Sequence, residues 1–591
     1  MSATQGLPAR APLRKRSWAF PKRSGRVGLA GWVILGAGVL AALYLISAPL
    51  GMLLVAAFRG PKDLLPFEPG AEWTLGNFAA VYLDRDLYRV VIPNTLVFVA
   101  GAVALAFVTA FILAWLVERT DLPGRNATFT LVLFPLLIPG VVVAIAWIFL
   151  LGPHAGWVNV LIRGIAGIEG DGPLDIFSMG GMILAQGVAL VPFIFLLLSA
   201  VLRSMNPALE EASQVAGASP FKTFWRVTLP VLRPGILAPL ILAVLVALEQ
   251  FEIPLVIGLP ARIAIFSTRI YYELNPDTNL PAYGRAAAVA LPFLVAGILL
   301  LLVYNRLIRD AERFVTVTGK NFRPVRLPLG RWKAPALALV ALYVGFAVLL
   351  PLLVLVWTSF YGYAAPSLAV LASARLDAYR NLFADGSFWL ALRNTFWVAG
   401  ASAAIVTVIG ALLAWTVLRT KLWGRAVLDF LSFVSIGIPS VIAGLAAVLL
   451  YLTLPLGIYG TVWVLVLAYS YRLAVATRSS RAALAQLHRE LEEAADVAGA
   501  SWLAAMRRVV LPLLAPALLG NFVLLFIVGF REFTLPVILQ SPENTVLSVT
   551  LWSLFVSNKS ADAAALGTLI VVCVVPVIVL ARRTLLARGR A

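Results

Sequence analysis

Twelve apolar segments, each long enough to cross a lipid bilayer as a helix, run through this chain of 591 residues. A membrane-spanning helix needs about 20 consecutive apolar residues, because the hydrocarbon core of a bilayer is about 30 Å thick. The composition agrees, since 61% of the residues are hydrophobic and 13% are charged, whereas in globular chains about a quarter are charged. The sequence therefore predicts an all-α polytopic membrane protein.

The predicted spans form two successive sets of six. In the first set they cover residues 27–58, 90–117, 129–151, 182–202, 235–257 and 286–303. In the second set they cover residues 336–357, 396–417, 430–452, 461–476, 517–538 and 563–580. We therefore expect two tandem six-helix halves with about 12 transmembrane helices.

The distribution of charge predicts how these spans are oriented. Lys and Arg in short loops are retained on the cytoplasmic side of a bacterial membrane. They are concentrated between and beyond the two sets of spans, while the loop 59–89 is near neutral or acidic. We expect localisation in the bacterial inner membrane with both termini in the cytoplasm. The expected division is a basic cytoplasmic tail at 1–28, a first half at 29–305, a basic cytoplasmic linker at 306–334, a second half at 335–581 and a cytoplasmic tail at 582–591.

The formal net charge of +19 is typical of a nucleic-acid-binding protein, but its placement is not. The basic residues stand between apolar segments, which fits cytoplasmic loops better than a groove-binding face. We therefore expect no nucleic-acid partner. Cys573, His154 and His488 are the only Cys and His residues, so we also expect no metal site in this chain.

The chain repeats itself in two registers. At a shift of 300 residues, Asn94-Thr95 matches Asn394-Thr395, Arg119-Thr120 matches Arg419-Thr420, and Ile138-Pro139 matches Ile438-Pro439. At a shift of 282 residues, 209–219 matches most of 491–501, and Leu229-Pro230 matches Leu511-Pro512. The change of register places an insertion in the first half, within residues 152–180. Because both halves have the same sidedness, we expect a parallel repeat about an axis along the membrane normal, with the pore between the halves.

The repeated segment is polar and is predicted to lie in the cytoplasm, between the fourth and fifth spans of each half. Its residues predict two short helices around a turn: Gly217 permits the end of the first helix, Ser219 caps the second, and Leu229-Pro230 ends it. One copy alone would be interpreted as an ordinary amphipathic loop. Two copies in one register favour equivalent docking faces for a dimeric partner.

This segment resembles the EAA loop of binding-protein-dependent ABC importer permeases. The resemblance covers residues 94–304 and 394–580, and it implies a type I ABC importer permease (MetI-like) fold. It also implies that the loops dock into two copies of an ABC ATPase subunit, which bind the ATP, while a periplasmic solute-binding protein delivers the solute. Ser213 departs from the motif, which has alanine there. The residues that carry the resemblance are Glu210, Glu211, Ala212, Gly217, Leu229 and Pro230 in the first half and Glu492, Glu493, Ala494, Ala495, Gly499, Leu511 and Pro512 in the second.

The sequence contains no Walker loop of the form G-x-x-x-x-G-K-[ST], and neither G-x-S-x-G nor H-E-x-x-H. We therefore expect a transporter subunit that is not an enzyme and holds no cofactor. The resemblance implies that it works by ATP-driven alternating access. A fused pair of this length resembles the ferric-iron importer permeases, so Fe³⁺ is the expected solute, with thiamine, a polyamine or a phosphonate as alternatives. An ion-coupled secondary transporter of 12 spans is a different class that also has two parallel halves, and a channel or scaffold is a third.

Few charges lie within or at the ends of the predicted spans, where a charge is expensive. Glu249 and Glu252 are predicted to share one face of the fifth span, Arg472 lies in the tenth, and Arg531 and Glu532 lie in the eleventh. At the 282-residue shift, Glu249 matches Arg531. These residues line the outer part of the translocation path, or make a structural or gating contact with Glu249 paired to Arg531 across the pseudo-two-fold axis, or all lie in the headgroup region.

Overall fold

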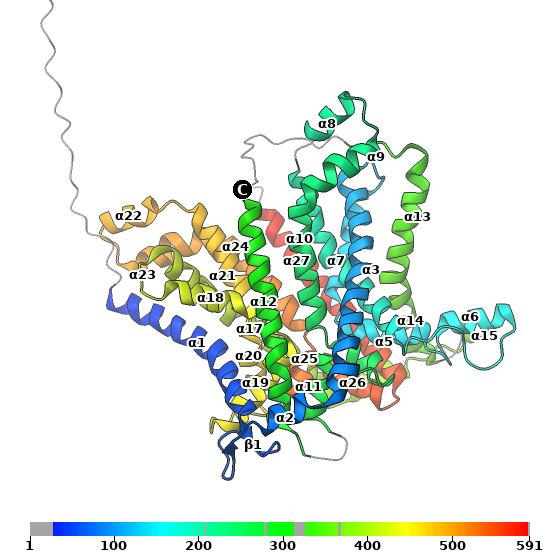
Figure 1. The fold of residues 1–591 in the computed structure, drawn as a ribbon, viewed down its shortest axis with the longest axis horizontal. Coiled ribbons are helices and arrows are strands. Elements are labelled where there is room, and N and C mark those ends of the chain that lie inside the picture. Colours follow the sequence, from blue (N-terminus) through cyan, green and yellow to red (C-terminus); the bar gives the residue numbers. More distant parts are fainter. Residues whose placement is uncertain (1–27, 206–207, 277–279, 313–325, 364–367, 589–591) are drawn as a thin grey trace, which may run out of the picture.

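The computed structural model describes residues 28–205, 208–276, 280–312, 326–363 and 368–588. These residues form a bundle of helices with one short antiparallel pair, β1 (Arg59–Gly60) with β2 (Glu72–Trp73) (Figure 1). The predicted tail at 1–28, apart from its last residue, and residues 313–325 of the predicted linker lie outside the described residues.

The first half runs from blue through cyan to green in Figure 1. Its helices are α1 (Leu29–Ala57), α2 (Gly76–Tyr82), η1 (Leu87–Val91), α3 (Ile92–Arg119), α4 (Arg125–Leu133), η2 (Phe134–Leu137), α5 (Gly140–Leu151), α6 (Trp157–Ala166), α7 (Met179–Ser204), α8 (Ala208–Val215), α9 (Pro220–Thr223), η3 (Phe224–Thr228), α10 (Leu229–Glu249), η4 (Pro254–Gly258), α11 (Phe266–Leu274) and α12 (Tyr283–Glu312).

The second half repeats this order with local differences. Its helices are η5 (Gly330–Trp332), α13 (Lys333–Val344), η6 (Gly345–Leu349), α14 (Leu350–Tyr361), α15 (Leu368–Leu371), α16 (Asp377–Ala384), α17 (Gly386–Arg419), α18 (Arg425–Val434), η7 (Ser435–Gly437), α19 (Ser440–Thr453), α20 (Val462–Tyr469), α21 (Leu473–Gln486), α22 (Glu490–Val497), α23 (Trp502–Ala505), η8 (Met506–Val510), α24 (Leu511–Phe530), α25 (Thr534–Ile538), α26 (Leu547–Val556) and α27 (Ser560–Arg588).

Among the described residues, seven helices are long and apolar enough to cross a membrane, and three bent helix pairs raise the number to ten. The two remaining predicted spans, 461–476 and 563–580, fall on α20 with α21 and on α27. A break at Ser470–Arg472 divides α20 from α21. The described apolar part of α27, Ser560–Val574, is shorter than a full span.

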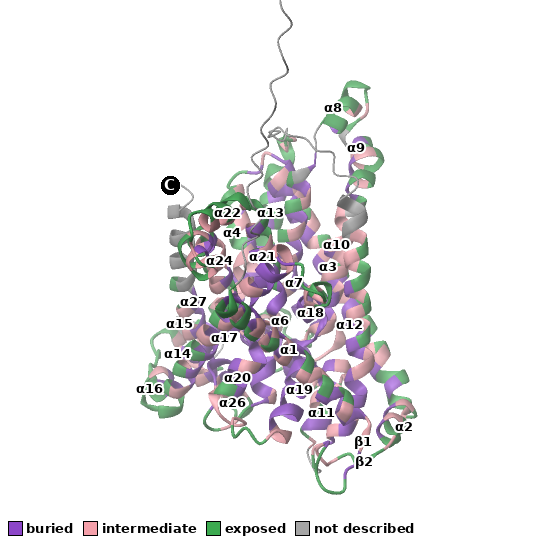
Figure 2. Ribbon diagram, turned by 90° about the vertical axis from the view of Figure 1, so that its left-hand side faces the viewer, coloured by how far each residue is buried: buried purple, intermediate pink, exposed green. Residues whose placement is uncertain are grey.

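The third span of each half is not the straight helix that the sequence predicts. The chain bends by 100° between η2 and α5, and by 112° between η7 and α19. Both bends lie at an Ile-Pro step, where Ile138 and Ile438 are extended because the residue before a proline avoids the helical region. The helix that follows each bend, α5 or α19, is buried on nearly all sides, and α19 lies in the buried part of the bundle in Figure 2. The two bends therefore lie at the centre of the molecule.

The first span of each half packs against the other half. Helix α1 contacts α17, α18 and α19, and Gly38 of α1 lies against Leu412 of α17. Helix α13 contacts α4, and α14 contacts α5. The first span of each half thus contacts both halves, since α1 also packs on α12 and α14 also packs on α27 within their own halves.

Candidate functional site: coupling loops and the centre of the bundle

The repeated loops fold as two short helices around a turn, as predicted. The first helix of each loop ends at a glycine in the left-handed region, with φ of +82° at Gly217 and +79° at Gly499. The next amides, of Ala218 and Ala500, donate to carbonyls five residues earlier at 3.0 Å, which is the Schellman pattern. The hydroxyl of Ser501 accepts from the Ala504 N–H and caps the second helix. Helices α8 and α22 lie toward the same end of the bundle, opposite α2 and β1 (Figure 1).

The predicted end of the second helix at Leu229-Pro230 and Leu511-Pro512 is wrong. In both halves these residues begin a long helix, α10 or α24, that continues directly from the loop. The turn before each proline is a π-helix, η3 or η8, in which the backbone hydrogen bonds reach one residue further. The wider turn accommodates a proline ring where an α-helix would be broken. Each loop is therefore continuous with the fifth span of its half, which in the first half bends by 62° between Arg233 and Gly235.

An ion pair fastens each loop to the end of the second span. Arg119, the last residue of α3, pairs with Glu210 of α8, and both are buried. Arg419, the last residue of α17, pairs with Glu492 of α22, with 2.9 Å between Nε and Oε1. The arginines match at the 300-residue shift and the glutamates at the 282-residue shift, so one ion pair occurs twice. The sequence matched the arginines with each other, but nothing in it showed their partners.

The matching tryptophans Trp115 and Trp415 lie beside these ion pairs, although their contacts differ. The Arg119 guanidinium lies 5.9 Å from the Trp115 ring centroid, and Trp415 donates from Nε1 to Glu492 at 3.3 Å. Arg419 also donates to the carbonyls of Leu484 and Leu487 at the end of α21. These contacts place the second span, the fourth span and the loop of the second half in one unit.

The outer face of each loop is exposed and partly apolar. Glu211 and Glu493 point away from the bundle, unlike the buried Glu210. Val215 is 90% exposed and Val497 is 82% exposed, although both are large apolar residues. The exposed apolar residues are Leu209, Val215 and Phe221 in the first loop and Leu491, Val497 and Leu503 in the second. Each of the three in the first loop matches one in the second at the 282-residue shift.

Asp121 ties the linker between the halves to the end of α3. Its carboxylate accepts from the Leu329 N–H at 2.8 Å and pairs with Lys333 at 2.9 Å. The Leu329 hydrogen bond, followed by Lys333, lowers the pKa of Asp121 below its usual value. The carboxylate is therefore charged at neutral pH. The contact would weaken only as the pH falls through this lowered pKa.

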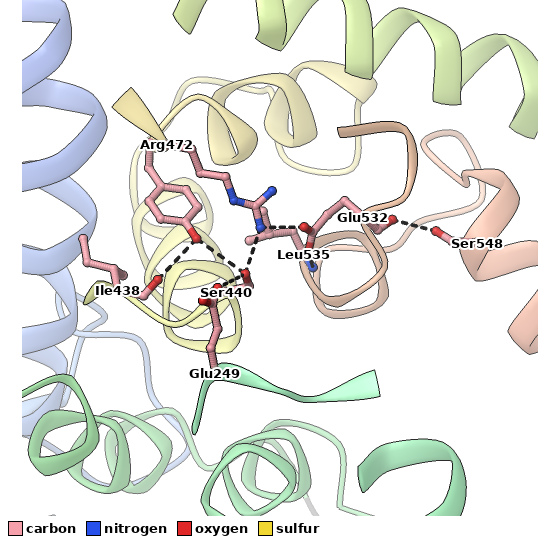
Figure 3. A network of polar contacts seen from close by, with 8 residues as sticks. Glu249, Ile438, Ser440, Arg472, Glu532, Leu535 and Ser548 are labelled. Atoms are coloured by element: carbon pink, nitrogen blue, oxygen red, sulfur yellow. Dashed lines mark hydrogen bonds and ion pairs between the residues drawn. The ribbon is translucent and has the colours of Figure 1, made fainter. Parts of the chain in front are cut away.

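At the centre of the bundle, a polar network joins the two halves (Figure 3). The Ser440 hydroxyl, at the start of α19, donates to Glu249 Oε1 of the first half at 2.8 Å. Arg472 Nη2 donates to Ser440 Oγ at 2.8 Å and to Glu532 Oε2 at 2.5 Å. The second carboxylate oxygen of Glu532 accepts from the Leu535 N–H. Arg472 stands at the break between α20 and α21, rather than inside a helix as predicted.

A second contact reaches from the end of the fifth span of the second half to the bend of the first half. Arg531 donates from Nη1 to the carbonyl of Leu136, at the bend of the first half. The Glu252 carboxyl lies against Gly140 at the start of α5, where no room remains for a Cβ. Glu249 and Arg531 are therefore not hydrogen-bonded to each other, because each reaches the bend of the opposite half.

Glu249 and Glu252 do not share one face of a helix, which corrects the prediction. Helix α10 ends at Glu249, and Gln250 is extended with ψ of 132°. Glu252 begins the next short helical segment, which leads into η4. The fifth span is thus interrupted between the two carboxylates.

Phe251 and Phe533 lie between the charged residues of the two halves, and the sequence analysis missed both. They match at the 282-residue shift, within the segments Phe251-Glu252-Ile253-Pro254 and Phe533-Thr534-Leu535-Pro536. Their rings stack with centroids 6.4 Å apart and planes 24° from parallel. Phe251 is 1% exposed and Phe533 is 0% exposed. The shared F-x-[IL]-P pattern was the available signal.

Among the described residues, no group of three or more His, Cys, Asp and Glu side chains could hold a metal ion. In the cluster around Arg472 and Arg531, the Glu532 carboxylate pairs with the Arg472 guanidinium.

Two repeated halves of membrane-length helices, with matched loops at one end and a shared polar centre, define a two-fold membrane transport component. The chain belongs to the family of inner membrane components of binding-protein-dependent transport systems, whose model matches residues 119–313 and 406–588. It is an ABC importer permease with two copies of the family domain in one chain.

Curated relatives of the chain include permeases for several solutes. It is 28% identical over 496 residues to the ferric transport system permease protein FbpB of Actinobacillus pleuropneumoniae, covering 83% of this chain and 70% of that one. It is 23% identical to the Fe(3+)-transport system permease protein FbpB 2 of Haemophilus influenzae, covering 76% of this chain and 80% of that one. The sulfate transport system permease protein CysW of Escherichia coli is 29% identical over 46% of this chain and 86% of its own length.

A solved bacterial ABC transporter involved in the import of the acidic polysaccharide alginate aligns with 48% of this chain and 96% of its own. The TM-score is 0.35 and the identity is 20%.

Proposed function

We propose that this permease imports Fe³⁺ across a bacterial inner membrane, with both termini in the cytoplasm. The solute is taken from the ferric permeases to which the chain is similar over most of its length. Thiamine, a polyamine or a phosphonate is the alternative within the same class. An ion-coupled carrier has no use for two matched docking loops, so the repeat favours the ATP-driven mechanism.

The observation that carries the proposal is the pair of exposed loops. Val215 and Val497 stand almost fully exposed at matching positions, beside the exposed Glu211 and Glu493. Large apolar side chains left in water in this way mark a protein interface. Two equal faces fit two copies of one partner, and an ABC ATPase subunit bound in two copies meets that requirement. ATP is then bound by the partner, and this chain transmits its motion.

The remaining loop residues have distinct roles. Glu210 and Glu492 hold the loop to the bundle, while Gly217 and Gly499 shape its turn. Leu229-Pro230 and Leu511-Pro512 join the loop to the fifth span. Ala212, Ala494 and Ala495 belong to the first loop helices, where small side chains allow close approach of a partner. A periplasmic solute-binding protein would deliver solute at the opposite end of the bundle, and closure of the ATPases would rock the halves.

Charged substitutions on the exposed loops test the docking faces. Val215→Asp and Val497→Asp each place a carboxylate in the proposed interface, and the double variant places one in both. We expect the double variant to lose copurification with the ATPase subunit while its membrane abundance stays normal. A matched control is Val408→Asn on the exposed surface of α17, away from the loops. Unchanged copurification of the double variant would contradict the proposed docking.

A further inference from the structure

Phe251 and Phe533 mark the pseudo-two-fold axis of the molecule. Residues at matching positions of two related halves contact each other only near the axis that relates the halves. These two rings match at the 282-residue shift and stack at 6.4 Å. A solute pathway between the halves follows the same axis, so it passes through this aromatic pair.

Both rings are supported from behind by their own half. Phe251 packs against Tyr271 of α11 with centroids 5.5 Å apart, and Phe533 packs against Trp552 of α26 at 6.3 Å. Neither ring is open to solvent, since they are 1% and 0% exposed. The axis is therefore closed at this level in the structure.

Matching residues connect the aromatic pair to the opposite half. Glu249 stands two residues before Phe251, and Arg531 stands two residues before Phe533. Glu249 accepts from Ser440 at the start of α19, and Arg531 donates to Leu136 at the bend of the first half. Each contact crosses between the halves at the bend of a third span, so the two phenylalanines stay together only while the bends stay in place.

Each phenylalanine occupies a short non-helical connection. Phe251 follows the extended residue Gln250 between α10 and η4, and Phe533, with φ of −123°, lies between α24 and α25. Such positions at helix ends absorb the backbone changes of a hinge. The long helices α10 and α24 run from these connections to the repeated loops.

We propose that Phe251 and Phe533 form the gate of the solute pathway, and that Glu249–Ser440 and Arg531–Leu136 hold this gate closed. The proposal rests on the importer function proposed above. Motion of the loops along α10 and α24 would separate the rings, break both contacts and open the axis.

Crosslinking tests the gate in the full complex with its ATPase and binding protein. Cys573, the only cysteine, is first replaced by serine, and Phe251→Cys and Phe533→Cys are then introduced together. A short bis-methanethiosulfonate reagent should join them and lower ATP-driven uptake of radioactive Fe³⁺ to about a tenth or less, since a hinge held at its centre cannot open. Reduction should restore uptake. The matched control is Phe129→Cys with Phe195→Cys, a ring pair 5.3 Å apart within the first half, whose crosslink should leave uptake unchanged.

The outcomes distinguish failure of the gate from failure of the proposed function. Failure to crosslink, or efficient crosslinking with unchanged uptake in a working parent, would overturn the gate alone. A cysteine-free parent without ATP-driven uptake, at normal abundance and with ATPase present, would overturn the proposed function and the gate with it. A second variant, Phe251→Ala with Phe533→Ala, should raise ATP-independent leak of the solute severalfold. Leak equal to that of the parent would also contradict the gate.

Discussion

At the scale of single residues, the arginine at the end of the second span is the detail that joins the loop to the bundle. Arg119 and Arg419 each bind a glutamate of a repeated loop, through a buried contact in the first half and a partly exposed contact in the second. A buried ion pair is sensitive to loss of one partner, because the remaining charge is left without compensation. These arginines are therefore positioning residues for the loops.

Reversal of one charge should uncouple the second loop. Arg419→Glu places two carboxylates together, and we expect the solute moved per ATP hydrolysed to fall about tenfold. The double variant Arg419→Glu with Glu492→Arg restores opposite charges and should recover most of the loss. Uptake and ATP hydrolysis are measured together in proteoliposomes.

The control for that reversal is Arg380→Glu, which changes the same charge on an exposed arginine of α16, beyond the other end of α17. It should behave as the parent. If Arg419→Glu couples transport to ATP hydrolysis as the parent does, the role assigned to the Arg419–Glu492 ion pair is wrong.

The turn glycine of the second loop gives a second prediction. Gly499 has φ of +79°, a value that proline cannot adopt because its ring fixes φ near −65°. Gly499→Pro should therefore abolish transport while the protein still inserts, since the turn is distorted and the bundle is not. Gly499→Asn is the control, because Asn tolerates the left-handed region. Normal uptake by Gly499→Pro at normal membrane abundance would refute this prediction.

At the scale of elements, the fourth spans of the two halves differ. Helix α7 is continuous, whereas its counterpart is divided into α20 and α21 at Arg472. The 282-residue shift matches Arg472 with Leu190, so the cation and the break occur together in one half only. The break lets the arginine reach Ser440 and Glu532 at the centre.

Removal of this cation should destabilise the second half. In Arg472→Leu the mostly buried Glu532 loses its charged partner, at a cost of about 3 kcal/mol. We expect an earlier thermal unfolding midpoint in detergent. Adding Glu532→Gln removes the unpaired charge and should recover part of the loss. An unchanged midpoint in Arg472→Leu would show that the ion pair contributes nothing.

The sequence predicted the existence of these elements better than their bends. Spans and loops follow from apolar length and from the repeat, and the left-handed glycines follow from local backbone preference. The bends at Ile138-Pro139 and Ile438-Pro439 were visible as matched prolines, yet their size depends on packing against distant segments, such as η4 against α5 and α25 against α19. The partners of Arg119, Glu249 and Arg531 come from distant segments, which no local pattern reveals.

At the scale of the whole molecule, the contacts of each first span with the other half make the two halves interdependent. Helix α1 packs on α17 and α19, while α13 and α14 pack on α4 and α5. The two copies of the family domain, by contrast, begin only at residues 119 and 406. The first spans thus serve as clamps that lie outside the matched domains.

Separate expression of the halves tests this arrangement. Residues 1–319 and 320–591, made as two chains, should assemble and copurify, because the clamps and the central network do not need the linker. Deleting residues 1–57 from the first chain should greatly reduce copurification through loss of the contact between α1 and α17. The same yield of complex with and without α1 would contradict the clamp.

The most direct test of the central claim is uptake of radioactive Fe³⁺ into proteoliposomes that contain this chain and its ATPase subunit. The solute-binding protein is supplied loaded on one side and ATP on the other. The account predicts uptake that requires both ATP and the binding protein. Uptake that proceeds without ATP and follows an imposed proton or sodium gradient would contradict it and indicate an ion-coupled carrier.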